Sequence, residues 1–206
     1  MPTLDEKLFQ IKTSEGAAYG CNQEWYREFW RKKSGCGATA AADIFMYLSR
    51  SMPNRFSLCP CDTELTVESA ILVMDEMWPH FTPRAMGLNR PEYFAEGVEK
   101  VNALFGLNIR PRMLSVPRSG TKAARPTSEE FLKFVSGGLA GGSPVAFLNL
   151  SNETLPDVSA WHWVAITALE DGIATLSDEG EKKTAALVPW LERTKKGGGL
   201  VFVELF

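Results

Sequence analysis

The sequence contains no long apolar run, and this absence bears on where the protein works. No stretch approaches the ~18 consecutive apolar residues that a membrane-spanning helix needs. Residues 1–7 lack a basic region followed by an apolar core, which is the pattern of a signal peptide. We therefore expect no membrane partner and a cytoplasmic location.

Cysteine and histidine are also scarce, with four and two residues respectively in 206. Four cysteines in a chain of this length do not form a secreted disulfide framework. Cys59 and Cys61 could join Cys21 and His80 around a zinc ion, but zinc-binding cysteine pairs usually have two to four intervening residues. A loop with two incidental or redox-sensitive thiols is the favoured interpretation, so we expect no metal and no cofactor.

Charge of one sign is not concentrated anywhere in the chain. The 22 lysine and arginine residues against 25 acidic residues give a net charge of −3. The basic runs at 31–33 and 195–196 are short, as on an ordinary solvated surface, so nucleic-acid binding is disfavoured and we expect no nucleic acid as a partner. With 45% hydrophobic and 23% charged residues, the composition predicts one globular domain over residues 1–206.

The spacing of apolar residues divides this domain into two parts. Helical spacing predicts helices from Cys36 to about Arg50, from Thr66 or Thr63 to Pro79, from Pro91 to Gly106, and from Ser128 to Gly137. Strand-like runs follow at 145–150, 161–169, 172–177, 184–188 and 200–206. Residues 111–126 are predicted to be a surface connection. Helices followed by strands indicate an α+β fold, with a helical lobe over about 1–140 and a β lobe over about 141–206.

The segment from Ser34 to Asp43 is the most informative motif. Cys36 stands between two glycines, immediately before the first predicted helix, which Ser34 could cap. Free N–H groups at a helix N-terminus stabilise negative charge, so this position favours a thiolate. Gly35 and Gly37 would leave the sulfur unshielded. The plain alternative is a buried structural thiol.

The second informative segment is 161–166, which places His162 in an apolar, strand-like run. A lone cysteine with a distant histidine is the usual layout of a thiol nucleophile and its base. The plain alternative here is a histidine packed in the core.

Four short motifs resemble those of papain-like cysteine peptidases, most closely the branch related to the peptidases that process double-glycine bacteriocin leaders. They are Gly20-Cys21-Asn22-Gln23, Ser34-Gly35-Cys36-Gly37-Ala38-Thr39-Ala40, Gly142-Ser143-Pro144-Val145 and His162-Trp163-Val164. The resemblance spans roughly residues 20–180, and its tight matches are the cysteine motif and the histidine strand. Two features depart from the family pattern: Ala38 stands where proline is common, and Gln23 lies farther from Cys36 than usual.

The resemblance implies a papain-like fold, with the cysteine at the start of a central helix and the histidine and acid on an antiparallel sheet. It implies that Cys36 is the nucleophile and that His162 is the general base. It also implies that Gln23 donates a side-chain N–H to the oxyanion, beside the backbone N–H of Cys36. Asn22 could serve in place of Gln23.

The third catalytic member must accept a hydrogen bond from His162, and Asp178 and Glu181 compete for this role. A two-residue turn at Asp171-Gly172 would set His162 opposite Glu181. A three-residue loop that begins at Glu170 would set Asp178 opposite Val164, diagonal to His162 on the same face. The order of residues in the family also favours Asp178, which we predict.

These residues together predict a thiol hydrolase, most simply a peptidase that acts on a peptide or protein through a Cys36-His162-Asp178 triad. A thiol acyltransferase on the same site is one alternative. A non-catalytic peptide-binding module with the same fold is another.

Overall fold

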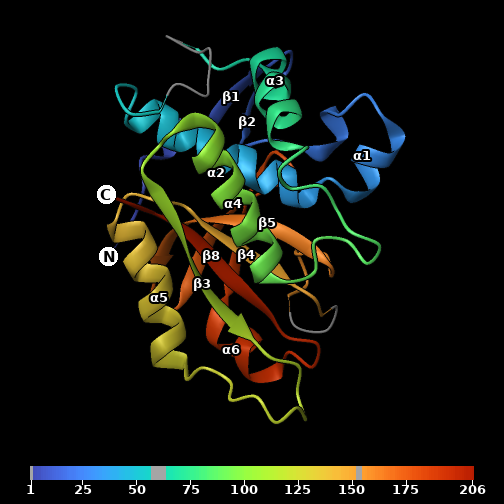
Figure 1. Ribbon diagram of the computed structural model, residues 1–206, viewed down its shortest axis with the longest axis vertical. Helices are drawn as coiled ribbons and strands as arrows, with labels where there is room; N and C mark the ends of the chain where they lie inside the picture. Colours follow the sequence, from blue (N-terminus) through green and yellow to red (C-terminus); the bar gives the residue numbers. More distant parts are fainter. Residues whose placement is uncertain (1, 57–63, 152–154) are drawn as a thin grey trace.

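The computed structural model describes residues 2–56, 64–151 and 155–206, and Figure 1 shows the arrangement of their helices and strands. The α-helices are α1 (Phe29–Ser34), α2 (Cys36–Ser51), α3 (Val67–Met77), α4 (Pro91–Phe105), α5 (Ser128–Ala140) and α6 (Leu187–Arg193). The strands are β1 (Gln10–Thr13), β2 (Gly16–Tyr19), β3 (Ile109–Val116), β4 (Val145–Asn149), β5 (His162–Glu170), β6 (Ile173–Asp178), β7 (Glu181–Ala186) and β8 (Gly198–Leu205). Two short 3-10 helices, η1 (Glu6–Phe9) and η2 (Gln23–Trp25), complete the described elements. The predicted α+β class is confirmed.

Six of the strands form one antiparallel sheet in the order β3-β8-β4-β5-β6-β7. Strands β1 and β2 form a separate hairpin. The central strands β4 and β5 are buried along nearly their whole length, because helices cover both faces of the sheet.

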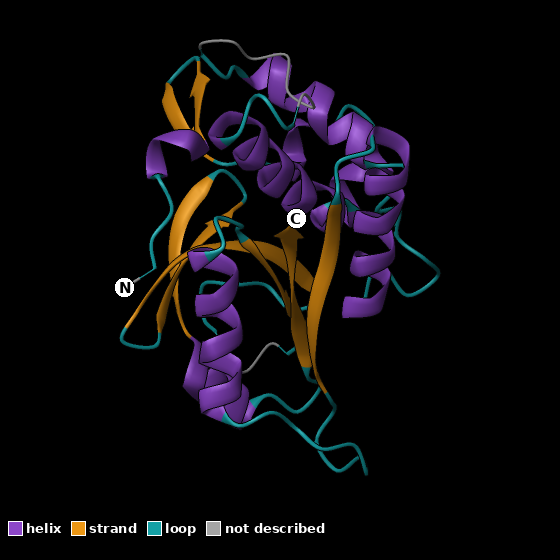
Figure 2. Ribbon diagram, turned by 60° about the vertical axis from the view of Figure 1, so that its left-hand side comes forward, coloured by secondary structure: helices purple, strands orange, loops and turns teal. Residues whose placement is uncertain are grey.

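The helices lie in two groups on opposite faces of the large sheet (Figure 2). On one face, the Asp43 side chain of α2 bonds to Ser177 on β6, and Phe94 of α4 packs on Trp163 of β5. On the other face, Trp190 of α6 packs edge-on against Phe147 of β4. Helix α5 joins this second group, since its Phe131 also contacts Trp190. This arrangement seats α2 directly beside the strands that carry the histidine and the acid.

Three predicted helices begin where their capping residues indicate. Thr66 caps α3 in a capping box with Ser69, and Pro91 occupies the first turn of α4. Helix α4 ends at Gly106 in the left-handed conformation, as a glycine stop requires. Helix α5 begins at Ser128 but runs past Gly137 to Ala140. Gly138 does not end the helix. A Cβ at this position would lie 2.7 Å from the Val145 side chain, so the glycine is needed for close helix–sheet packing.

The predicted cap of α2 was wrong. Ser34 is the last residue of α1, where its hydroxyl donates to the Trp30 carbonyl, and Gly35 links the two helices. A Cβ on Gly35 would lie 2.4 Å from the Arg31 carbonyl oxygen, and one on Gly37 would lie 2.6 Å from the side chain of Leu88. The two glycines are therefore required by tight packing around Cys36, not only by access to its sulfur.

Strand β3 was missed, because residues 111–116 were predicted to be part of a surface connection. It lies at the edge of the sheet, where Pro111 needs no partner for an N–H and where polar side chains face outward. The predicted strand at 184–188 is divided between the end of β7 and the start of α6. Cys59 and Cys61 lie outside the described residues. Within the described ranges, none of the helices is both long enough and apolar enough to cross a bilayer.

Candidate active site

Cys36 is the first residue of α2 and is partly exposed. Its sulfur lies 3.9 Å from the Trp161 carbonyl oxygen, to which the thiol can donate. The first-turn N–H groups of a helix have no partner within the helix, and the Cys36 N–H is one of these. Cys36 therefore offers, at the same point, a partly exposed sulfur and a backbone N–H that has no acceptor within its own helix.

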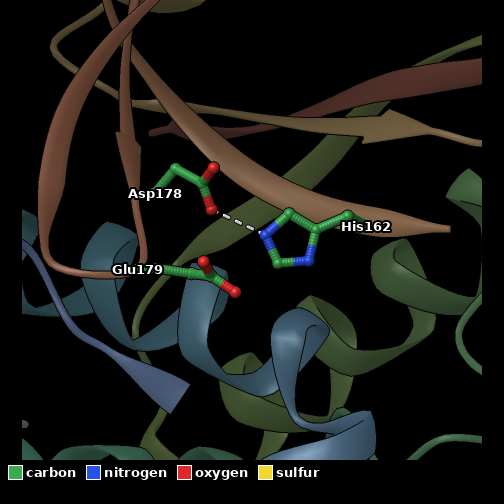
Figure 3. Close-up of side chains that lie close together, drawn as sticks. All are labelled: His162, Asp178 and Glu179. Carbon is green, nitrogen blue, oxygen red and sulfur yellow. Dashed lines mark hydrogen bonds and ion pairs between the residues drawn. The ribbon is translucent and has the colours of Figure 1, made fainter. Parts of the chain in front are cut away.

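His162 begins β5 and is buried, with 7% of its surface exposed. Its Nε2 donates to the Asp178 Oδ1 at 2.6 Å, as the dashed line in Figure 3 shows. The imidazole lines the same small cavity as Cys36, and the Cys36 thiol is among the groups that raise the pKa of the ring. Since Asp178 occupies Nε2, the other nitrogen, Nδ1, is the one left for the thiol. The structure thus brings together Cys36, His162 and Asp178.

The predicted hairpin geometry was wrong, although it selected the residue that the structure places beside His162. The turn has two residues, Asp171 and Gly172, both with positive φ as a type I′ turn requires. Next to this turn Glu170 pairs with Ile173, but a bulge between Ile166 and Ala168 shifts the register by one residue. The pairing then continues as Ile166 with Leu176, which puts Asp178 on the same face as His162.

Glu181 is excluded from this position by a second tight turn. Glu179 and Gly180 both have positive φ and end β6 at Asp178, so Glu181 belongs to β7 and pairs with Asp178 across the turn. Its side chain is 72% exposed, and it lies 3.8 Å from Lys183.

Lys183 is a site residue that the sequence analysis missed. Its ammonium donates to the Asp178 Oδ2 at 2.9 Å, so the carboxylate is held on one side by imidazole and on the other by ammonium. The signal was present: a two-residue Glu179-Gly180 turn places Lys183 diagonal to Asp178 on one face of the sheet.

Burial and charge act in opposite directions on this cluster. Burial by itself would raise the pKa of Asp178, but hydrogen bonds and charge from His162 and Lys183 outweigh it and lower that pKa below its usual value. Burial disfavours the charged form of His162 as well, yet the bonds to Asp178 and Cys36 outweigh it and raise the pKa of the imidazole. The site therefore favours an imidazolium next to the thiol.

The structure distinguishes between the two candidates for the oxyanion donor. Gln23 lines the same small cavity as Cys36 and His162. Its Nε2 donates one hydrogen to the Lys32 carbonyl at 3.0 Å, which leaves the second amide hydrogen free. Asn22 is occupied elsewhere, since its Oδ1 caps η2 and its Nδ2 donates to the Glu179 carbonyl.

A larger cavity opens on another side of Cys36, with a volume of ≈ 200 Å³. Its wall is mainly apolar, with Lys33, Ser34 and Asn89 as its polar members, and its apolar side chains are those of Met86, Leu88, Leu148, Leu150, Trp161 and Trp163. Trp161 has φ 57°, a left-handed conformation that is unusual for an aromatic residue. Trp161 is also the residue whose carbonyl oxygen faces the Cys36 sulfur, and it lines the cavity.

Among the described residues, one group of side chains could supply three ligands to a metal: His162, Asp178 and Glu179 (Figure 3). Their ligand atoms lie within 4.8 Å of one another. However, Asp178 already accepts hydrogen bonds on both oxygens, and the Lys183 ammonium beside it would repel a cation. These hydrogen bonds and the nearby ammonium therefore weigh against a cation at this position.

No known family model matches the sequence, and no curated protein matches it either.

Proposed function

We propose that the protein is a cysteine-dependent hydrolase of the papain-like type, most simply a peptidase, with Cys36, His162 and Asp178 as its triad. The observation that carries the proposal is the hydrogen bond from His162 Nε2 to Asp178, on an imidazole that lines the same small cavity as Cys36 at the start of α2. The proposed nucleophile, its base and the residue that orients the base thus come together in one site, as covalent catalysis requires.

In the proposed reaction, the Cys36 thiol gives its proton to His162 Nδ1, the sulfur attacks a carbonyl carbon, and the carbonyl electrons move to the oxygen. The N–H groups of Cys36 and Gln23 stabilise this oxyanion. His162 then gives its Nδ1 proton to the leaving amine, the C–N bond breaks and a thioester remains. Water next gives a proton to His162 as its oxygen attacks the thioester. The C–S bond then breaks, the acid leaves, and His162 returns the proton to the Cys36 sulfur.

Asp178 holds the imidazole in the required tautomer and stabilises its positive charge. Lys183 fixes the second oxygen of Asp178, so the carboxylate cannot rotate away from the ring. An acyltransferase would use the same residues, with an amine or a thiol in place of water. The apolar cavity beside Cys36 favours a substrate with a bulky side chain near its carbonyl in either reaction.

Peptide preference tests this proposal. We expect peptides with leucine or phenylalanine near the scissile bond to be cleaved at least about tenfold faster than glycine analogues, because the cavity beside Cys36 buries an apolar side chain. Hydrolysis of matched fluorogenic peptides gives kcat/KM, and intact-protein mass spectrometry detects the thioester on Cys36.

The control uses two tryptophan substitutions at half-buried leucines. Leu150→Trp should narrow the cavity and reduce the preference, whereas Leu132→Trp on α5 should leave it unchanged. Acyl transfer to an added amine with no hydrolysis would favour the alternative. No thioester with any peptide would contradict both enzymatic proposals.

The oxyanion donor gives a separate prediction. Gln23→Ala should lower kcat by about 10²-fold, the usual cost of removing one such donor, with KM changed little. Asn22→Ala is the matched control and should stay near the wild-type rate, since its amide does not line the cavity. Steady-state kinetics on one fluorogenic peptide compares the two. Equal rates for Gln23→Ala and the wild type would leave the backbone N–H of Cys36 as the sole proposed donor.

A further inference from the structure

Asp43 is a buried carboxyl group that the proposed mechanism does not use. It lies on α2 two turns after Cys36 and is 3% exposed. Its Oδ1 accepts the Cys21 backbone N–H at 2.7 Å, and its Oδ2 lies 2.6 Å from the Ser177 hydroxyl. Every contact comes from a segment distant in sequence, so the carboxyl joins separate parts of the fold.

The number of hydrogen atoms available at Ser177 indicates whether Asp43 carries a proton. The Ser177 Oγ also lies 3.0 Å from the Tyr19 carbonyl oxygen. A hydroxyl has one hydrogen, and a carbonyl oxygen can only accept. If Asp43 were ionised, Ser177 would face two acceptors with one hydrogen. If Asp43 carries a proton, it donates to Ser177, and Ser177 donates to Tyr19, so every buried group is satisfied.

The surroundings of Asp43 favour the neutral form as well. Burial raises the pKa of Asp43 to about 6, although the bonds from Ser177 and Cys21 act against the rise. The negative charge of Asp178 adds to the rise, and the nearby groups Cys21 and Tyr19 are themselves neutral thiol and phenol. No cation forms an ion pair with Asp43 within the described part of the chain.

The network joins the segments that carry the site. Helix α2 carries Cys36, the segment at Cys21 leads directly to Gln23, and Ser177 precedes Asp178. The packing is so close that a Cβ on Gly20 would lie 1.9 Å from the Ser177 oxygen, and its φ of +77° also requires glycine.

We propose that Asp43 is a positioning residue that works as a neutral carboxylic acid, donating its proton to Ser177 and so fixing the Gln23 segment and the end of β6 against helix α2. This proposal rests on the proposed function in one respect: Gln23 and Asp178, whose segments Asp43 holds in place, are residues that the proposed reaction uses. The proton on Asp43 does not depend on catalysis, so it can be tested without an activity.

The central test compares Asp43→Asn with the wild type. The amide N–H can donate to Ser177 and the amide oxygen can accept from Cys21, so this variant should retain the network. We expect it to fold, and we expect its Cys36 alkylation rate at pH 5, where Asp43 of the wild type carries its proton, to stay within about twofold of wild type when followed by mass spectrometry of the Cys36 peptide. Asp43→Ala should reduce that rate at least about tenfold.

The pH dependence of stability gives a readout that a merely structural contact would not move. An ordinary carboxyl loses its proton near pH 4, whereas Asp43 in the folded protein retains it to about pH 6. Folded protein then binds the extra proton in this interval, so this group's contribution to stability is complete below pH 4 and is lost as pH rises through 6. The urea midpoint of Asp43→Asn should therefore rise relative to that of the wild type between pH 4 and 6.5. Above pH 6.5 the difference between the two midpoints should stay constant.

The infrared difference spectrum between the wild type and Asp43→Asn at pH 5 supplies an independent check, because the wild type should show one additional protonated carboxyl beyond the partly protonated surface groups that both proteins share. Parallel urea midpoints from pH 4 to 6.5, or no such additional carboxyl, would overturn the neutral acid. An Asn variant as impaired as Asp43→Ala would overturn the positioning role. Failure of peptide hydrolysis with these readouts intact would count against the proposed function alone.

Discussion

Replacing Cys36 with alanine is expected to reduce peptide hydrolysis on the order of 10⁶-fold, the size of loss found when a covalent nucleophile is removed. The free energy of unfolding should change by less than about 1 kcal/mol, because the side chain is small and partly exposed. Fluorogenic hydrolysis and urea unfolding measure the two quantities. A variant that is active, or one that is strongly destabilised, would favour a structural thiol instead.

Iodoacetamide separates Cys36 from the other thiols and tests the role of His162. The partners of His162 raise the pKa of its imidazole to about 10, so a positive charge stands in the cavity that Cys36 lines, where it favours the thiolate. His162→Ala should therefore slow alkylation of Cys36 at least about tenfold at a single pH of 5. Cys21→Ala is the control: Cys21 is buried, so this variant should retain the fast reaction while losing about 1–2 kcal/mol of stability.

The second large effect is expected at the acid. Asp178→Ala should lower kcat/KM by about 10²-fold or more, because His162 loses the acceptor that sets its tautomer and favours its charge. Without that carboxylate the pKa of His162 falls, so the alkaline limit of activity should move to lower pH. Asp178→Asn should cost less, since the amide oxygen still accepts from Nε2.

Glu181→Ala is the matched control, and its rate should stay within about twofold of wild type. Both substitutions remove a carboxylate near Lys183, but only Asp178 contacts the imidazole. The comparison uses one peptide over a range of pH. A large loss in Glu181→Ala alone would contradict the assignment of the acid and the mechanism built on it.

The helices were predictable because their ends carry local signals. Thr66, Pro91 and Gly106 act on backbone groups within a turn of themselves, so their effect needs no knowledge of the rest of the fold. Strand β3 carries no such signal. An edge strand with Pro111 reads as a loop until its partner β8, which lies far along the chain, is known.

The site divides in the same way. Cys36 and His162 stand out in the sequence because the glycines and the apolar strand are local features. The position of Asp178 relative to His162 depends on the bulge in β5, which the turn residues Asp171 and Gly172 do not indicate. The role assigned to Asp43 depends on three distant segments that meet at one carboxyl, which no spacing in the sequence indicates.

The bulge at Thr167 determines which side chains of β5 and β6 lie on the same face of the sheet. The Thr167 side chain is anchored by the Tyr19 hydroxyl at 2.8 Å, and its carbonyl accepts the Leu4 N–H, so the extra residue is held from outside the hairpin. Loss of one residue between His162 and the turn would invert every side chain on one arm relative to the other. Changes of length in this hairpin can therefore preserve the pairing of His162 with Asp178 only when they compensate one another.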